Sequence, residues 1–468
     1  MTDDDLCFTP ATQLAALIKA GTLSPVELTE AVIRRIETLE PRLNAFATFT
    51  PQRALDAARA AQQALTSGAA VGPLLGVPVT IKDLADTAGI ASQKGSHILA
   101  GHVPAADAPL VTRLRAAGAI VLGKTTTSEF GWKGVSQSPL TGITHNPWRH
   151  GYNAGASSAG AGAAAAAGYG ALHHGSDGAG SIRMPAHFCG VFGFKPSFGR
   201  IPNVPVRNND QSSHHGPITR TVADAALMLR VMAGAHPLDH YSLAGEPVDY
   251  GAHLGDGVRG LRVAFSPDLG HARVDGEVRD VIAEAVRAFD ELGAIVEQPE
   301  LPFAARGPEL ARFFWRAHEL PLAQHLDAFE SRMDPGLVAC IRDAEGISAA
   351  QYLEMRAAKL AYVEQIHSFF QHYDLLLTPA VSVAAFPAER LQPEHWPQHP
   401  WDWLAWSQFA YPFNFSGNPA ASVPAGFTAD GLPVGMQIVG RRLADHTVLA
   451  AAAAFEAVRP WAQHRPAP

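Results

Sequence analysis

Three serines in small-residue surroundings are the side chains of this sequence best suited to covalent chemistry. Ser157 and Ser158 lie among Gly and Ala, and Ser181 follows 24 residues after Ser157 in the run Ser-Asp-Gly-Ala-Gly-Ser-Ile-Arg. Small residues let the backbone approach another group and direct N–H donors at it. A serine hydroxyl is a weak nucleophile until a base takes its proton, and a lysine can be that base. Lys82, at the end of the apolar run Val-Pro-Val-Thr-Ile-Lys, is the candidate.

Taken together, these motifs resemble the amidase signature family, a family of serine hydrolases that act on amides. The resemblance covers nearly the whole chain and is weakest between about residue 240 and residue 400. Besides the lysine run, the serine pair and the Ser181 run, it includes four further motifs: Phe188-Cys-Gly-Val-Phe-Gly-Phe-Lys-Pro196, Gly216-Pro-Ile-Thr-Arg220, Gly417-Asn-Pro-Ala-Ala-Ser-Val-Pro-Ala-Gly426 and Gly431-Leu-Pro-Val-Gly-Met-Gln437.

The resemblance implies a role for each residue of the Lys-Ser-Ser set. Ser181 is expected to attack the amide carbonyl, and Ser157 to relay the proton between Ser181 and Lys82. In the family the serine that matches Ser157 follows a non-proline cis peptide bond, which costs about 3–4 kcal/mol and persists only where its surroundings enforce it. Ser158 is expected to support the site through hydrogen bonds or to act directly.

The Ser181 turn carries the other expected functions. The backbone N–H groups of Gly178, Ala179, Gly180 and Ser181 are expected to form the oxyanion hole. Asp177 and Arg183 flank the turn and are expected to form the ion pair that fixes its shape.

Lys82 can act as a base only when its amine is neutral, whereas a free lysine has a pKa of about 10.4. Desolvation of the charged form can lower that pKa. The hypothesis therefore requires that Lys82 is buried and that no carboxylate pairs tightly with it. Asp83 is adjacent in sequence but is expected to point the other way on a strand.

Aromatic residues are expected near the substrate. Phe130 and Trp132 follow a Lys-Thr-Thr-Thr-Ser-Glu run, where family members line the acyl pocket, and a second aromatic group occupies residues 401–413. Such groups serve in core packing or subunit contacts more often than in pockets. If they do line the pocket, the preferred substrate is apolar or aromatic.

The sequence departs from the family pattern at two places. Family members usually show Gly-Gly-Ser-Ser-Gly-Gly-Ser, where this chain ends its serine motif at Ala161. The Ser181 run has Gly178 and Ala179 where Thr and Gly are typical. An N–H donor survives a change from Gly to Ala unless the residue needs a positive φ, so Ala179 is expected to be harmless. An altered substrate range is left open.

Bulk composition excludes several classes of protein. The 468 residues are 47% hydrophobic and 17% charged, as in a folded globular protein. A net charge of -8 argues against nucleic acid as a partner, and no apolar run is long enough to span a membrane. The acidic start of the chain is unlike a signal peptide, so a cytoplasmic location is expected. Three widely spaced cysteines indicate neither disulfides nor a metal site, and no cofactor or metal is expected.

Helical and strand patterns alternate along the chain. An amphipathic helix begins with a capping box at Ser24 and Glu27, a second helix is predicted over residues 51–66, and a third over 159–172. Strands are predicted at 77–82 and 119–122, again from 374 and over 420–439. The alternation predicts an α/β fold, a large mixed β-sheet covered by helices on both faces.

The organisation is expected to be a single amidase domain over residues 1–468. Within it we expect N-terminal helices over 1–68, a catalytic core over 69–240, a helical elaboration over 241–400, and a return to the core over 401–468. No linker or repeat marks a boundary between domains.

The sequence thus predicts an amidase that acts on a small-molecule amide, and it leaves a homodimer open. Two alternatives remain. One is the glutaminase subunit of a glutamine-dependent tRNA amidotransferase, which resembles the same family. The other is a non-catalytic binding protein that retains the fold.

Overall fold

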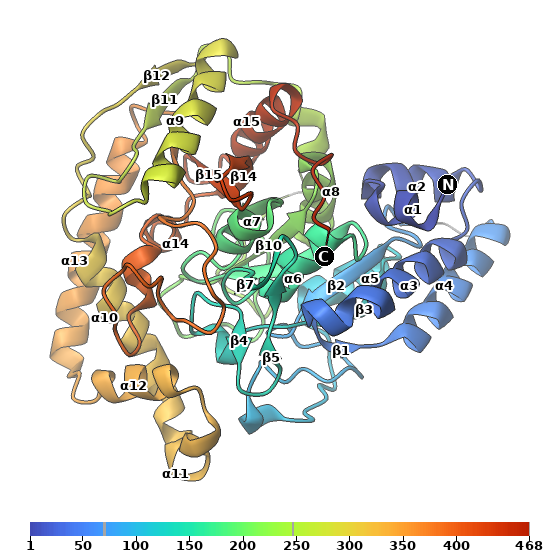
Figure 1. Cartoon of the computed structure of the whole chain (residues 1–468), viewed down its shortest axis with the longest axis horizontal. Helices are drawn as coiled ribbons and strands as arrows, with labels where there is room; N and C mark the ends of the chain where they lie inside the picture. The colour runs from blue at the N-terminus through green and yellow to red at the C-terminus, as the bar shows by residue number, and fades with distance from the viewer. Residues whose placement is uncertain (69–71, 246–247, 468) are drawn as a thin grey trace.

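One mixed β-sheet organises the chain and draws its strands from every part of the sequence (Figure 1). The computed structural model describes residues 1–68, 72–245 and 248–467. In spatial order the eleven strands are β1 (Phe46–Phe49), β3 (Ile120–Thr125), β2 (Pro78–Lys82), β8 (Leu172–Asp177), β10 (His214–Thr219), β9 (Phe192–Lys195), β14 (Ala420–Phe427), β15 (Pro433–Gly440), β13 (Leu375–Pro379), β11 (Arg262–Phe265) and β12 (Ile295–Glu297).

The sheet combines both kinds of pairing. Strand β2 runs parallel to its neighbours β3 and β8, and β11 runs parallel to β12 and β13. The pairs between β8 and β13 are antiparallel. All residues of β2, β3 and β8 are buried, as expected of strands covered on both faces. Four short strands form two hairpins outside the sheet: β4 (Gln137–Ser138), β5 (Gly142–Ile143), β6 (His145–Asn146) and β7 (Arg149–Asn153).

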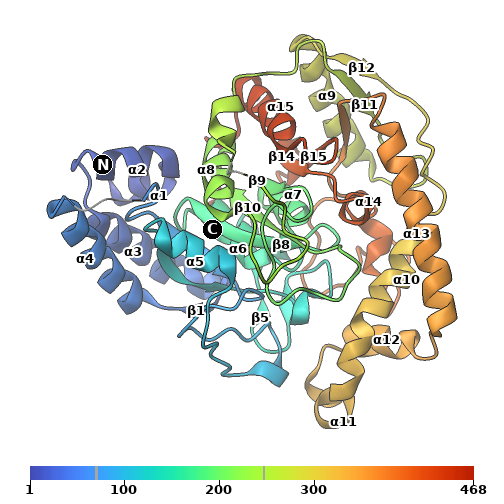
Figure 2. The same ribbon diagram turned by 180° about the vertical axis from the view of Figure 1, so that it is seen from behind.

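Helices cover the two faces of the sheet, as predicted (Figures 1 and 2). On one face α6 (Ala159–Ala167) packs on β2 and β8, and α7 (Arg183–Cys189) packs on β9, β14 and β15. The other face carries α4 (Pro51–Thr66), α5 (Pro109–Ala116), α8 (Val222–Met232), α9 (Gly276–Glu291) and α15 (Asp445–Val458).

The remaining helices lie at the two ends of the sheet (Figure 1). Beside β1–β3 are α1 (Asp3–Phe8), α2 (Ala11–Lys19) and α3 (Pro25–Leu43), the last capped by Ser24, which accepts from the N–H groups of Val26 and Glu27. At the other end are α10 (Gly307–Glu319), α11 (Leu326–Phe329), α12 (Pro335–Ala344), α13 (Ala349–Phe369) and α14 (Tyr411–Phe415).

Helix α6 consists only of Ala and Gly and packs closely on its neighbours. A Cβ on Gly160 would lie 2.3 Å from the carbonyl oxygen of Ala45, so only glycine fits there. The prediction of one helix over 159–172 is wrong in its last turn. Gly168 adopts a φ of +76° and ends the helix, and residue 172 begins β8.

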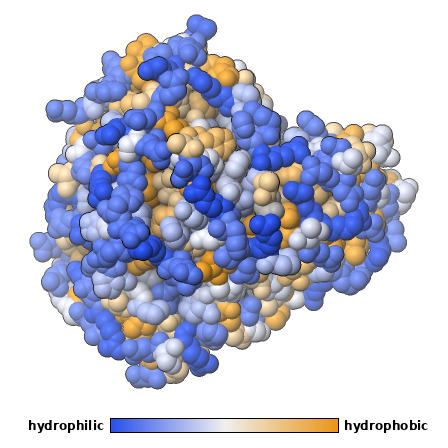
Figure 3. Space-filling model, in the orientation of Figure 1, coloured by the Kyte–Doolittle hydropathy of each residue, from blue (hydrophilic) through white to orange (hydrophobic). Residues whose placement is uncertain are grey.

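Residues 241–400 contribute strands as well as helices, because β11, β12 and β13 extend the sheet on its far side. The division of the chain into four segments remains a prediction. In Figure 3, apolar residues on the visible face are scattered among hydrophilic ones. In the described part of the chain, no helix has the length and hydropathy needed to cross a membrane.

Candidate active site

Two parallel strands bring the predicted base and the serines to one edge of the sheet. Lys82 is the last residue of β2, and Ser176 lies near the end of the neighbouring strand β8. Ser157 precedes α6, and Ser181 lies in the turn between β8 and α7. Because parallel strands end at the same edge, the four side chains meet in a buried cluster.

The side-chain nitrogen of Lys82 bonds to two hydroxyl groups and one carbonyl. Nζ lies 2.8 Å from Ser157 Oγ, 2.9 Å from Ser176 Oγ and 3.2 Å from the Ser176 carbonyl oxygen. A neutral amine has two N–H donors and one lone pair, so three such contacts require that one hydroxyl donates to Nζ. When Ser157 is that donor, Lys82 is placed as its base.

Burial lowers the pKa of Lys82 well below its usual value, and the positive charge of Arg207 acts in the same direction. Among the described residues no carboxylate lies within 4.0 Å of Nζ. Asp83 lies 3.6 Å from Lys124, and Asp177 pairs with Arg183. The burial and the lack of a tight carboxylate partner that the base hypothesis required are therefore both present.

The backbone of Ser157 holds the predicted nucleophile. Its N–H donates to Ser181 Oγ across 3.3 Å, which places Ser181 beside the serine that contacts Lys82. The cis bond expected before Ser157 is absent: in the described ranges only Val204–Pro205 is cis. A trans bond avoids the energetic cost of a non-proline cis bond, and Ser157 still reaches Lys82.

Ser158 supports the strand that carries Ser176. Its hydroxyl donates to the Ser176 carbonyl oxygen at 3.1 Å and accepts from the Ser176 N–H at 3.3 Å. Sequence reasoning treated Ser176 as part of a turn and missed it as a contact of Lys82. Its position directly before Asp177 in the motif was the only available signal.

The Asp177 carboxylate shapes the turn, and it changes the predicted oxyanion hole. Asp177 accepts from the N–H groups of Gly180 (2.7 Å) and Ile182 (3.1 Å). The prediction that the Gly180 N–H serves an oxyanion is therefore wrong in this structure, because that donor is already bonded to a carboxylate. Gly178 and Ala179 line the pocket beside Ser157, and their oxyanion role remains a prediction. Gly180, not Ala179, has the positive φ, +118°.

Arg183 forms the predicted ion pair. Its Nη2 and Nε lie 2.8 Å and 3.0 Å from the two carboxylate oxygens of Asp177, and both side chains are fully buried. Burial alone would raise the pKa of Asp177, but Arg183 holds it below its usual range. Nη1 also donates to Gln437 and to the Ala410 carbonyl oxygen, which ties the turn to β15 and the segment before α14.

A pocket with about 660 Å³ of empty space, part of it open solvent, lies over the serines. Phe130 lines it, as predicted. Trp132 does not: it is fully buried, its carbonyl accepts from the indole of Trp403, and it packs against Gly336. Phe130 adopts a left-handed φ of +49°, and the turn places residues 130 and 132 in different surroundings.

Sequence reasoning missed most of the pocket wall. From α10 come Phe314, Trp315, His318 and Glu319, from the loop before β10 comes Arg207, and Leu404, Tyr411 and Phe415 complete the apolar part. These residues follow no motif or period that relates them to the serines.

A chain of neutral histidines backs the Lys82 strand. The Lys82 N–H donates to His174 Nδ1 at 3.3 Å, so the proton of His174 is on Nε2, which lies 3.0 Å from His215 Nδ1. His215 Nε2 then lies 3.1 Å from Asn203 Oδ1. Burial lowers the pKa of His174 and of His215, so both rings stay uncharged beside Lys82.

Comparison with known proteins identifies the family. The family described as Amidase matches residues 27–449. An acylamidase of Rhodococcus erythropolis is 40% identical over 100% of this chain and 99% of its own length. A subunit of the glutamyl-tRNA(Gln) amidotransferase of Moorella thermoacetica is 34% identical over 99% of both chains. The crystal structure of a bacterial aryl acylamidase of the amidase signature family superposes with a TM-score of 0.91 at 32% identity, covering 97% of each chain.

The chain therefore belongs to the amidase family. The predicted family, fold class and class of enzyme, one that hydrolyses amides, are confirmed.

Proposed function

We propose that the chain hydrolyses a carboxylic amide to a carboxylate and ammonia or an amine through an acyl-enzyme at Ser181. The observation that carries the proposal is the contact series of Lys82 Nζ, Ser157 Oγ and, through the Ser157 N–H, Ser181 Oγ. A buried lysine without a carboxylate partner has the lowered pKa that a base needs.

In the first half-reaction, Ser181 Oγ bonds to the carbonyl carbon of the amide. Its proton passes to Ser157, and the Ser157 proton passes to Lys82. The negative charge that develops on the carbonyl oxygen is stabilised by the N–H groups of Gly178 and Ala179. When the C–N bond breaks, the leaving nitrogen takes the proton back through the same relay, and the acyl group stays on Ser181.

In the second half-reaction, water attacks the acyl carbon. Lys82 accepts the proton of that water through Ser157, and Ser181 Oγ recovers a proton when the carboxylate leaves. Each step uses only the side chains of this cluster, the substrate and water.

The body of the substrate is apolar or aromatic. Phe130, Trp315, Leu404 and Tyr411 supply the wall against which it packs. The similarity to an acylamidase and to an aryl acylamidase supports the same substrate class.

The test is a panel of aryl and short aliphatic amides with the purified chain alone, read by mass spectrometry. Hydrolysis by the wild type and its loss in Ser181→Ala are expected. Covalent labelling of Ser181 by a fluorophosphonate, abolished in Lys82→Ala, excludes a non-catalytic binding protein. A wild-type chain that neither labels nor hydrolyses any amide contradicts the proposal.

A second candidate is the glutaminase of a tRNA amidotransferase, favoured by the full-length similarity to one subunit of such an enzyme. That kind of glutaminase would deliver ammonia to a partner chain. Turnover of simple amides without any partner favours the amidase, whereas activity confined to glutamine and dependent on a partner favours the glutaminase.

We also propose a cytoplasmic location and a homodimer. The acidic N-terminal sequence supports the first proposal. Fractionation of cells and the mass of the purified chain by light scattering test the two separately.

A further inference from the structure

Two charged side chains line the pocket and have no part in the proposed mechanism. Arg207 and Glu319 share this pocket with Ser157, Gly178 and Ala179. Most of the remaining wall is apolar. A charge in such surroundings is costly unless a partner of opposite charge offsets it.

The Arg207 guanidinium has no such partner among the described residues. No carboxylate oxygen lies within 4.0 Å of it, and no acceptor within hydrogen-bond distance is supplied by the parts of the chain that the structure describes. The contrast is Arg183, which forms hydrogen bonds through all three of its nitrogens. The fork of N–H donors on Arg207 is therefore available to a ligand.

The loop that carries Arg207 is held in place from the opposite side. Asp210 accepts from the hydroxyl of Tyr352 at 2.7 Å, and its backbone carbonyl accepts from Lys359 Nζ at 2.8 Å. Arg356 Nε lies 3.4 Å from the Asp210 carboxylate. These contacts with α13 fix the loop and offset the charge of Asp210, which leaves the charge of Arg207 uncompensated.

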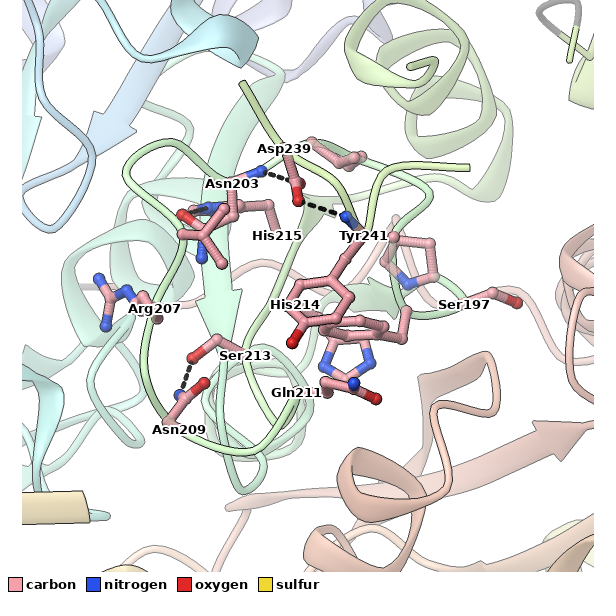
Figure 4. A pocket seen from close by; sticks show the side chains of 15 residues that line it. Ser197, Asn203, Arg207, Asn209, Gln211, Ser213, His214, His215, Asp239 and Tyr241 are labelled. Atoms are coloured by element: carbon pink, nitrogen blue, oxygen red, sulfur yellow. Dashed lines mark hydrogen bonds between the residues drawn. The ribbon is translucent and has the colours of Figure 1, made fainter. Parts of the chain in front are cut away.

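Arg207 points away from the neighbouring polar cavity. Figure 4 shows that cavity, with Tyr241 and His214 on one side of the loop and the guanidinium of Arg207 directed to the other side. The guanidinium also contributes to the lowered pKa of Lys82, which places its charge near the reacting groups.

Glu319 does not cancel that charge near neutral pH. Burial raises the pKa of Glu319 to about 8, against the opposing effect of Arg207. Burial likewise lowers the pKa of the neighbouring His318, which is neutral. At pH 7 the pocket therefore has a net positive charge at Arg207.

We propose that Arg207 binds a carboxylate on the amide substrate, so that the enzyme prefers amides with an apolar body and one anionic group. This inference rests on the proposed amide hydrolysis. An arginine binds a carboxylate through two parallel N–H donors, which would orient the substrate relative to Ser181 as well as attract it.

The experiment compares matched amides that differ only in the anionic group. On the acyl side, succinyl 4-nitroanilide is compared with pentanoyl 4-nitroanilide. On the amine side, 4-acetamidobenzoate is compared with 4-methylacetanilide. For each pair, kcat/KM of the carboxylate over that of the neutral amide is measured in wild type, Arg207→Gln and Arg207→Lys. Division by the wild-type ratio cancels the intrinsic reactivity of each substrate.

We expect Arg207→Gln to lower the ratio by roughly 10- to 100-fold in at least one series, as for loss of a charged hydrogen-bond partner. Arg207→Lys should retain part of the preference, because it keeps the charge but not the fork. Arg59→Gln, an arginine on the exposed side of α4, is the control and should leave both ratios unchanged.

Unchanged ratios in Arg207→Gln in both series, with the neutral amides still hydrolysed, would overturn the inference and leave the proposed function intact. A wild type that prefers the neutral member of both pairs would do the same. Failure of the wild type on every amide instead contradicts the proposed function, and this inference falls with it.

Discussion

Lys82 is the residue whose charge state decides whether the site can work. Its amine is surrounded by hydroxyl and carbonyl groups, which accept or donate hydrogen bonds without requiring an ammonium. A carboxylate at the same distance would favour the charged form and remove the base. The Lys-Ser-Ser set is therefore as much a matter of what is kept away from Lys82 as of what touches it.

Replacement of Lys82 by Met should lower kcat by on the order of 10²- to 10⁴-fold, the usual contribution of a general base. The wild type should show an acid limb in kcat/KM, because activity rises as Lys82 loses its proton. The lowered pKa places the midpoint well below the 10.4 of a free lysine. A wild-type profile that is flat from pH 5 to pH 9 would count against lysine as the base.

The same burial predicts a pH-dependent effect on stability. Unfolded Lys82 is protonated below about pH 10.4, while the folded residue is neutral down to its lowered pKa, so unfolding takes up a proton between these two values. Lys82 therefore destabilises the fold most at low pH, and its penalty shrinks by up to about 1.4 kcal/mol per pH unit as the pH rises.

The measurement is urea denaturation of wild type and Lys82→Met at pH 7 and pH 9. The free energy of unfolding of wild type should gain on that of the variant between the two values. Other buried lysines are present in both proteins and cancel in the difference. An equal difference at the two pH values would show that folded Lys82 keeps its proton.

At the scale of elements, the turn Glu129–Gly131 presses against the serine site. Gly131 adopts a φ of +83°, and a Cβ there would lie 2.9 Å from Leu84 Cδ1 and 3.3 Å from Ser157 Oγ. Gly131→Ala should displace Ser157 and lower kcat by roughly 10- to 100-fold, since small misplacements of reacting groups carry large losses in rate.

Gly101→Ala is the matched control. Gly101 has a similar φ of +76°, but a Cβ there meets nothing within 4 Å. It should therefore lose about 1–2 kcal/mol of stability from the backbone conformation alone, with kcat unchanged. Steady-state kinetics on both variants at equal folded fraction separates the two effects, and equal kcat values would refute the contact argument.

Sequence motifs predicted the elements that carry the chemistry, because the chemistry fixes residue types at strand ends and turns. The β-branched run before Lys82 and the small residues around Ser157 were sufficient to place the base and the relay. Side-chain direction within a turn was not predictable. The left-handed φ of Phe130 separates it from Trp132, and the Asp177 carboxylate takes the N–H of Gly180.

Long-range packing explains the remaining omissions. Arg207 and Glu319 reach the pocket from a loop and from the end of α10, more than 100 residues apart in the chain. No periodicity relates such residues to Ser181. Only the three-dimensional structure shows that they face the same space, and substrate preference is decided at that level.

At the scale of the whole molecule, Phe8 joins the two ends of the chain. Its ring lies under three guanidinium groups, at 4.6 Å from Arg35, 5.1 Å from Arg220 and 4.1 Å from Arg465. Asp4 offsets part of this charge, since Arg35 and Arg465 each lie within 2.9 Å of its carboxylate. Helix α1, helix α3, the end of β10 and the C-terminal segment therefore meet at one aromatic ring.

Phe8→Ala should lower the free energy of unfolding by about 3–5 kcal/mol, because it removes a buried ring and leaves three cations without their shared aromatic partner. Phe8→Leu keeps most of the volume but not the ring, so it should lose less. Urea denaturation gives the size of each loss, and limited proteolysis should show earlier cleavage in the N-terminal helices. Leu353→Ala, at a side chain that is 63% exposed, should stay within about 0.5 kcal/mol of wild type. If Phe8→Ala is no less stable than that control, the ends of the chain are held by their ion pairs and not by the ring.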